Sequence, residues 1–313
     1  MEIIYHQINI TNRDLEIELF KNLQNEDFLI IGIEVTDIEI EQYCSISIDP
    51  QHGGSNSENK ITSIEYIFNH IEYILDILKT NQKICMTTVK PDSDSIGAMG
   101  LLTLFITEKF KLDGDIILRL KAIAKSDRHG RINWKNKKED YFQFENYNVF
   151  GLPCGLSYMT SDKKLTCSEK VERLINYLET GEFKDIEKYN GIVSKNFKKA
   201  SKSIKINIII PGKLCLIESK YRGAISFGYR YAPCVIAKNK YYIFGNDNTK
   251  ISGKKITIAQ YEDKYINMND LLIQINKLEE GWGGSNVIIG SPIDRPTEIN
   301  EKKLIKLCKE YLY

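Results

Sequence analysis

Two aspartates separated by one residue form the segment with the clearest potential for chemistry. They lie in Pro91–Ala98 (PDSDSIGA), between a strand-like run at 84–89 and a helical pattern from about residue 96 to residue 110. Ligands of α/β proteins bind at the carboxyl ends of the strands, so Asp92 and Asp94 are expected at such a site. A divalent cation would relieve their mutual repulsion, which makes them candidate metal ligands and catalytic residues. A pair that only caps the helix would look the same.

Two further segments place an acid and a histidine together after a predicted strand. Asp127-Arg128-His129 follows a run at 116–124, and Asp49-Pro50-Gln51-His52 follows a shorter one at 45–48. Imidazole and carboxylate ligands suit Mn²⁺, Fe²⁺ or Zn²⁺ better than Mg²⁺. The candidate metal ligands are therefore Asp49, His52, Asp92, Asp94, Asp127 and His129, of which Asp92, Asp94, Asp127 and His129 are also candidate catalytic residues. His6 and His70 lie in strand-like and helical patterns, and we interpret both as structural.

A glycine-rich segment, Gly281-Trp282-Gly283-Gly284-Ser285, precedes a short apolar strand at 287–289. Glycines allow backbone N–H groups to converge on an anion, so Gly283, Gly284 and Ser285 are candidate substrate-binding residues. A plain helix-to-strand turn would explain the same glycines. Arg222 and Arg230 are candidate phosphate partners, because a guanidinium matches the geometry of phosphate.

These motifs resemble those of a known family. Pro91–Gly97 resembles the PDxDxxG motif of the DHH phosphoesterases, and Gly281–Ser285 followed by Ile289-Gly290 looks like the glycine-rich motif of their accessory DHHA1 domain. Thr88 stands where the family usually has a histidine, and Asp127-Arg128-His129 is the nearest match to the Asp-His-His triplet. Ser285 lies near the place of the accessory motif's histidine. The resemblance implies a metal-dependent phosphoesterase that cleaves short oligonucleotides, cyclic dinucleotides, single-stranded DNA or pyrophosphate.

The order of patterns predicts an α/β protein in which a parallel-sheet catalytic domain precedes a smaller mixed α/β accessory domain. Strands and helices alternate in the first part, which favours right-handed crossovers within a parallel sheet. We expect the first domain at 1–195, a polar linker at 196–203 and the second domain at 205–313. A solvated helix would have the same composition as the linker. The second domain is expected to hold strands at 206–210, 213–217, 224–227, 234–238, 241–244 and 255–259 and a helix at 268–278.

The composition narrows the classes of partner. With 43 basic and 42 acidic residues the formal net charge is +1, which gives no case for binding duplex nucleic acid or a membrane surface. The seven cysteines form no CxxC pair, so we expect reduced thiols. No signal peptide is apparent at the first residues, and a cytoplasmic location is expected. The sequence is compatible with a homodimer.

Three functional hypotheses follow from these patterns. The first is a phosphoesterase in which two divalent metal ions activate a water for attack on phosphorus. Mn²⁺ is the expected metal, with Mg²⁺, Fe²⁺ or Zn²⁺ as alternatives. Its substrate would be a small nucleotide, which fits the near-neutral chain best, or a short single-stranded oligonucleotide. The second is a sensor that binds a nucleotide without cleaving it. The third is a structural protein whose acids all cap helices.

Overall fold

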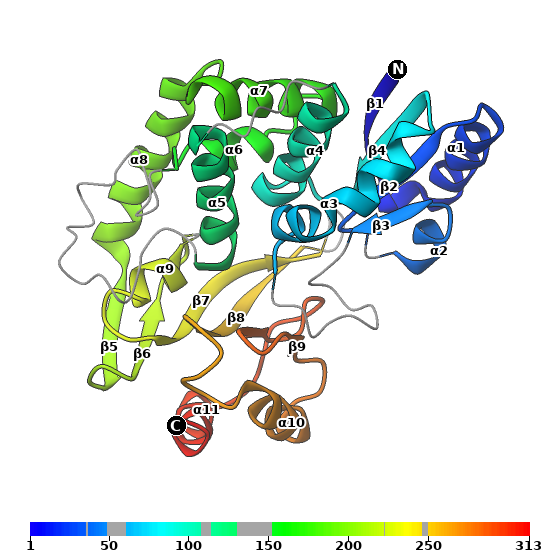
Figure 1. The fold of residues 1–313 in the computed structure, drawn as a ribbon. Coiled ribbons are helices and arrows are strands. Elements are labelled where there is room, and N and C mark those ends of the chain that lie inside the picture. Colours follow the sequence, from blue (N-terminus) through cyan, green and yellow to red (C-terminus); the bar gives the residue numbers. More distant parts are fainter. Residues whose placement is uncertain (36, 49–60, 108–113, 130–151, 222, 246–249) are drawn as a thin grey trace. The chain divides into compact units, whose positions relative to one another are not determined.

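Two sheets form the framework of this α/β protein, a parallel one of four strands and a mixed one of six (Figure 1). The computed structural model describes all residues except 36, 49–60, 108–113, 130–151, 222 and 246–249. Within the described residues, a first compact unit covers Met1–Arg128 and residues 152–193, and a second covers His129 and Ser194–Tyr313. No helix in this described part is long and apolar enough to span a membrane.

The first sheet has the predicted parallel arrangement. Its strands lie in the order β1 (Glu2–Gln7), β4 (Lys83–Thr88), β2 (Leu29–Ile33) and β3 (Ile46–Ile48). Each neighbouring pair is parallel. The central strands β4 and β2 are almost wholly buried, as expected for apolar runs covered on both faces. All four carboxyl ends therefore meet at one edge, where the chain continues into the candidate acids.

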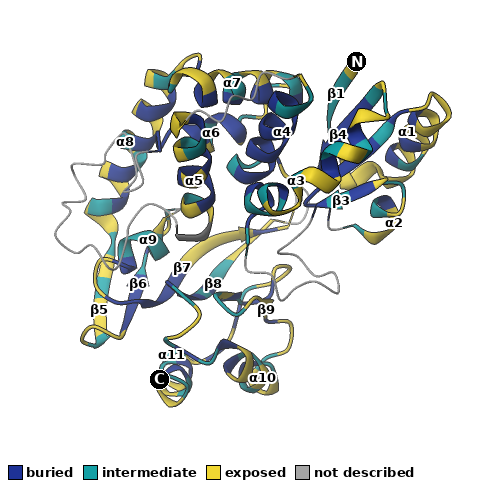
Figure 2. Cartoon of the chain, viewed as in Figure 1, coloured by how far each residue is buried: buried dark blue, intermediate teal, exposed yellow. Residues whose placement is uncertain are grey.

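Helices surround this sheet, and α4 is the most deeply buried of those described (Figure 2). Its apolar, glycine-containing sequence permits this, because no side presents a charged stripe to solvent. The helices of the first unit are α1 (Arg13–Asn25), α2 (Ile38–Glu41), α3 (Ser63–Lys79), α4 (Ser93–Ile106), α5 (Gly114–His129), α6 (Leu156–Thr160) and α7 (Cys167–Thr180), with a 3-10 turn at Ile10–Asn12.

The strand expected at 116–124 is wrong, because this segment belongs to helix α5. Ile116, Leu120 and Ile123 are buried at spacings of four and three residues, which is the helical period. The consecutive β-branched residues at 116–117 concealed that period in the sequence. As a consequence, Asp127 and His129 lie in the last turn of a helix and not at the end of a strand.

The linker expected at 196–203 is also helical, and it continues α8 (Ile186–Ser203). Val193, Phe197 and Ala200 are buried along one face of this helix. The lysines that gave the stretch its linker-like composition lie between these buried positions, as on a solvated helix. Phe197 stacks on Phe227 with ring centroids 5.0 Å apart, so the end of α8 packs within the second unit.

The second unit is a mixed sheet in the order β5 (Lys205–Ile210), β6 (Leu214–Glu218), β7 (Cys234–Phe244), β8 (Ile251–Gln260), β10 (Ile288–Gly290) and β9 (Gly283–Gly284). Its helices are α9 (Ala224–Gly228), α10 (Met268–Leu278) and α11 (Glu301–Glu310).

The helix expected at 268–278 is confirmed, but the strand expected at 224–227 is wrong, since it is helix α9. Four apolar residues are too few to separate the two periods. The runs at 234–238 and 241–244 are one strand, β7. Alternate residues of the sheet face two separate cores, one toward α10 and α11 and one toward α9.

Candidate functional site

Asp92 begins helix α4 as its N-cap. Its Oδ1 accepts hydrogen bonds from the backbone N–H groups of Asp94 and Ser95, both at 3.1 Å, and from the Ser95 hydroxyl at 3.2 Å. The Ser95 hydroxyl in turn accepts a hydrogen bond from the Asp92 N–H at 3.0 Å, which completes a capping box. Oδ2 accepts no hydrogen bond from the described residues. Asp92 is therefore a helix cap that still has an oxygen for a ligand.

Asp94 is fully buried and connects α4 to the start of α3. Its Oδ2 accepts from the Ser63 N–H at 2.6 Å, and its Oδ1 accepts from the Ile64 N–H at 3.4 Å. Both groups lie in the first turn of α3, where N–H groups have no partner within the helix. The positive end of the helix dipole favours a carboxylate there.

Glu34 is a third acid at this edge, and it is not among the candidate residues predicted from the sequence. It follows β2 in the left-handed region of the backbone, with φ of 54°, which is rare for a residue other than glycine. Its Oε1 accepts from the Ser63 hydroxyl at 3.0 Å, and its N–H donates to the Ile48 carbonyl at 2.9 Å. Its position directly after a buried apolar strand was a usable signal, the same one that identified Asp92.

These acids lie close enough for their charges to raise one another's pKa values, so we treat them as one cluster. Burial, followed by the charges of Asp92, Asp94 and Asp127, raises the pKa of Glu34 far above its usual range. Burial and the charge of Asp127 likewise raise the pKa of Asp94, against the lowering effect of the Ser63 N–H. Asp127 at the end of α5 therefore lies near enough to act on both. The acid cluster, defined here as Glu34, Asp92, Asp94 and Asp127, draws on α4, α5 and the end of β2.

The described residues of this cluster supply only part of the ligands that a divalent cation needs. Among the described residues, no group of three or more His, Cys, Asp and Glu side chains is arranged to hold a metal ion. Asp92 and Glu34 each have a carboxylate oxygen that accepts no hydrogen bond in that part of the chain, and hard oxygen donors suit Mn²⁺ or Mg²⁺. The predicted ligands Asp49 and His52 lie outside the described residues, and the His129 side chain is not described.

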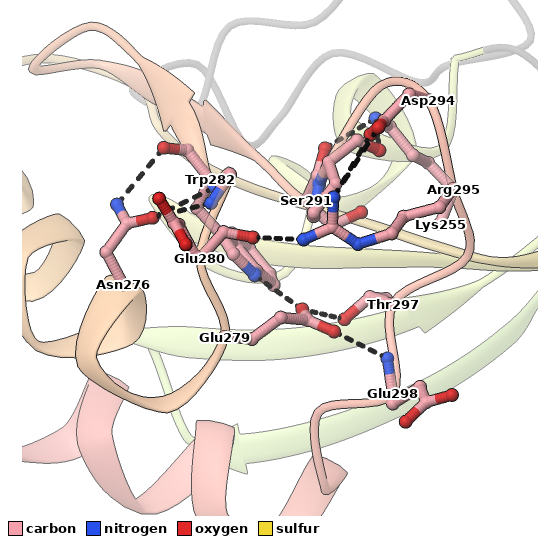
Figure 3. Close-up of polar contacts among 12 residues, drawn as sticks. Lys255, Asn276, Glu279, Glu280, Trp282, Ser291, Asp294, Arg295, Thr297 and Glu298 are labelled. Atoms are coloured by element: carbon pink, nitrogen blue, oxygen red, sulfur yellow. Dashed lines mark hydrogen bonds and ion pairs between the residues drawn. The ribbon is translucent and has the colours of Figure 1, made fainter.

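In the second unit, the N–H groups of the glycine-rich turn are largely engaged within the protein (Figure 3). The Asn276 Oδ1 accepts from the N–H groups of Gly281 and Trp282, each at 3.0 Å. The Ser285 N–H donates to the Ile288 carbonyl at 2.7 Å, and the Ser285 hydroxyl accepts from Val287 at 3.4 Å. Gly283 and Gly284 pair with β10 as strand β9. These contacts account for the turn without a ligand.

The half-buried carboxylate of Glu279 connects this turn to the chain near Thr297 (Figure 3). Glu279 accepts from the Trp282 indole N–H at 2.7 Å, from the Glu298 N–H at 2.7 Å and from the Thr297 hydroxyl. Arg295 donates to the Glu280 carbonyl at 2.6 Å. These bonds connect the end of α10 with the segment that leads to α11.

The structure does not bring Arg230 to the glycine-rich turn. Arg230 follows α9, which packs on the face of the sheet that holds Val235. Trp282 of the turn packs on the opposite face, with Ile236. The Arg230 side chain is exposed, and Arg222 lies outside the described residues.

Comparison with known proteins adds no relative: no family model matches the chain, and no curated protein matches it.

Proposed function

We propose that this protein is a divalent-metal-dependent phosphoesterase that hydrolyses a phosphate ester in a small nucleotide or short single-stranded oligonucleotide. The observation that supports it best is the acid cluster at the carboxyl edge of the parallel sheet, where α/β proteins bind ligands. The resemblance of Pro91–Gly97 to the first motif of the DHH phosphoesterases points to the same chemistry.

The cost of the cluster is a second reason for the proposal. Buried carboxylates that repel one another are unfavourable unless protons or a cation compensate them. Glu34 adds a backbone conformation that costs free energy, and such strain is concentrated at functional sites. Asp92 and Glu34 would bind the metal through the carboxylate oxygens that accept no hydrogen bond from the described residues. Asp49, His52, Asp94, Asp127 and His129 are the further proposed ligands. When bound, the metal would supply charge neutralisation at phosphorus and an activated water.

Metal binding and turnover test this proposal directly. We expect the purified protein to bind Mn²⁺ in an isothermal titration and to hydrolyse bis(p-nitrophenyl) phosphate in its presence. Asp92→Asn should lose metal binding and turnover while remaining folded, because asparagine also caps helices well. Asp76→Asn is the matched control, since Asp76 is an exposed acid on α3. Full Mn²⁺ binding and turnover in Asp92→Asn would refute the assignment.

A sensor without turnover is the second candidate function. Thr88 occupies the position of the family's usual histidine and is fully buried. Both oxygens of Asp94 are hydrogen-bonded to the backbone of α3, which leaves this residue less free to bind a metal. Such a protein would bind nucleotides in a calorimetric titration, yet release no product from them with Mn²⁺, Mg²⁺, Fe²⁺ or Zn²⁺.

A further inference from the structure

Strand β1 is the outermost strand at one edge of the parallel sheet, so only one of its sides pairs with a neighbour (Figure 1). The N–H groups of Glu2 and Ile8 donate to carbonyl groups on the β4 side, at 2.8 and 2.9 Å. Because bonding residues alternate along a parallel ladder, the even-numbered residues of β1 face β4. The N–H and C=O groups of Ile3, Tyr5 and Gln7 are therefore directed outward.

These outward groups form an open strand edge. Within the described residues, the backbone N–H and C=O groups of Ile3, Tyr5 and Gln7 take part in no hydrogen bond. A row of free backbone groups is a template for another strand, and edge strands are usually protected from this by lysine, proline or a bulge. The sequence of β1 has neither lysine nor proline, and its register with β4 is unbroken from Glu2 to Gln7. This edge can therefore accept a further strand.

Helix α1 covers β1 on one face of the sheet. The Nε2 of His6 in β1 lies 2.5 Å from the Oε2 of Glu16 in α1. The His6 ring also packs edge-on against the ring of Phe20, with centroids 5.9 Å apart. The helix therefore lies beside the open edge, and its outer flank borders the place where a further strand would bind.

The outer flank of α1 is apolar and exposed. The inner flank, with Arg13 and Lys21, contacts α2 and Tyr43, which lead to β3 at the far edge of the sheet. By the helical period, Leu15 and Leu19 lie on the opposite flank, so they point past β1. Leu15 is 65% exposed and Leu19 36%. Exposed apolar residues next to each other typically mark an interaction site.

We propose that β1 and α1 form the interface of a homodimer, in which the β1 strands of two copies pair antiparallel around a two-fold axis. This axis is perpendicular to the sheet, so both copies of α1 lie on the same face, and Leu15 and Leu19 of one copy pack against those of the other. The leucines favour a second copy over an extended peptide, because a lone strand has no helix to cover them. The inference concerns assembly and does not depend on the proposed activity.

The side chains of β1 suit one register of this pairing. With Ile4 on the axis, Glu2 lies opposite His6 of the second copy, and Ile3 lies opposite Tyr5 of the second copy. Ile3 and Tyr5 are outward-facing residues, so they exchange both of their backbone hydrogen bonds. Pairs of a carboxylate with an imidazole and of two apolar side chains stabilise an antiparallel ladder. A shift by two residues in either direction would place Glu2 opposite an isoleucine instead.

Sedimentation velocity of the full chain tests the assembly. We expect the wild type to have twice the mass of the chain at about 100 μM and to dissociate on dilution. Leu15→Glu should raise the dissociation constant of the dimer at least about ten-fold, because negative charges then face each other across the axis. Ile38→Glu is the matched control at an isoleucine of α2 that is 80% exposed, and it should dimerise like the wild type. A monomeric wild type, or undiminished dimerisation of Leu15→Glu, would overturn the proposal.

Hydrogen exchange distinguishes pairing at β1 from any other interface. The outward N–H groups of Ile3 and Tyr5 have no acceptor within the described part of a single chain, so they should exchange rapidly in the dissociated protein. In the dimer both should be protected, whereas helix α11 should exchange equally at the two concentrations. A dimer in which Ile3 and Tyr5 exchange as fast as in the monomer would place the interface elsewhere and overturn the proposal.

Proline at position 3 tests the contribution of the backbone. The Ile3 N–H is directed away from β4, so Ile3→Pro removes no bond of the parallel ladder, and edge strands tolerate proline at such a position. The variant should remain folded and fail to dimerise, whereas Ile3→Val keeps the N–H and should dimerise. A folded Ile3→Pro protein that dimerises like the wild type would exclude β1 from the interface. If Ile3→Pro does not fold, Leu15→Glu and hydrogen exchange still decide the outcome.

Discussion

Asp94 has a structural role that the Asp-x-Asp pattern did not reveal. Its carboxylate is the partner for two N–H groups at the start of α3, so it connects two helices inside the first unit. Asp92 instead caps the helix on which it lies. Asp92 and Asp94 therefore have different structural roles, although they are only two residues apart. Substitutions at the two sites should differ in their effect on the free energy of unfolding as well as on metal binding.

Removal of the Asp94 carboxylate should destabilise the first unit. Asp94→Ala leaves the buried Ser63 and Ile64 N–H groups unpaired, at a cost of about 2 kcal/mol in the free energy of unfolding. Asp94→Asn should recover most of that loss, because its amide oxygen still accepts from Ser63. Urea denaturation of the three proteins measures the difference. Equal stability of the alanine and asparagine variants would show that the hydrogen bonds contribute little.

Glu34 should make the stability of the metal-free protein depend on pH. Its pKa in the folded state is raised above the ordinary value of 4.5, so the unfolded chain loses its proton first as pH rises. The contribution is fully present below about pH 4.5 and is lost as pH rises toward the folded-state pKa. In EDTA, the melting temperature of the wild type should therefore fall more steeply than that of Glu34→Gln between about pH 5 and about pH 9.

Asp94 contributes to the same slope, so a reduced slope, and not its abolition, is expected in Glu34→Gln. Mn²⁺ should restore the melting temperature of the wild type at high pH, because the cation compensates the charge of the ionised carboxylates. Glu310→Gln, at an exposed glutamate of α11, should melt like the wild type throughout. If the melting temperatures of the wild type and Glu34→Gln change with pH in the same way, the raised pKa of Glu34 is contradicted.

At the scale of elements, the glycines of the hairpin formed by β9 and β10 differ in whether the backbone requires them. A Cβ on Gly284 would lie 2.1 Å from the Ile288 carbonyl oxygen, and the backbone there has φ of 142°. Gly281 also has a positive φ, of 97°. Nothing lies within 4 Å of a Cβ on Gly283. Two of the three glycines are therefore required by the turn itself.

Substitutions at the two adjacent glycines should have different effects. Gly284→Ala should lower the free energy of unfolding by about 2 kcal/mol through backbone strain. Gly283→Val should leave the melting temperature close to that of the wild type. If the turn also contacts an anionic substrate, Gly283→Val should weaken the binding of AMP in a calorimetric titration. Wild-type AMP affinity in this variant would reduce the turn to its structural role.

At the scale of the whole molecule, the boundary between the two units falls inside α8, between Val193 and Ser194. The first unit has its own large apolar core, and the second has separate cores on the two faces of its sheet. Phe197, in the part of α8 that belongs to the second unit, packs on Phe227 of the same unit. Each unit thus has its own apolar core, as an independent domain does. The chain passes from one unit to the other within helix α8 and not through an extended linker.

A fragment that ends at Val193 should therefore fold alone. We expect it to melt cooperatively in circular dichroism and to bind Mn²⁺, because the proposed ligands belong to the first part of the chain. It should lose most turnover of oligonucleotides, since remote contacts that position the substrate raise the rate of reaction. Unchanged kinetics in this fragment would exclude a role for the second unit in catalysis.

The sequence alone was sufficient for those features whose signal is local. The parallel sheet was predicted from the alternation of strands and helices, in which the run at 84–89 is strand β4 but the run at 116–124 is helix α5. Helix α10 has the bounds that the sequence predicted. The cap at Asp92 was one of the two readings of the Asp-x-Asp motif. These features depend on periodicity and capping chemistry, which operate over a few residues.

Only the tertiary structure decided which residues meet. Glu34 and Asp94 are 60 positions apart in the sequence, yet both bond to Ser63. The helices α5 and α9 replaced predicted strands, because contacts with other elements override a weak local preference in short apolar runs. The engaged N–H groups of the glycine-rich turn depend on Asn276 and Ile288, which the turn's own sequence does not specify. Local patterns set the elements, whereas burial and long-range hydrogen bonds set the cluster of acids.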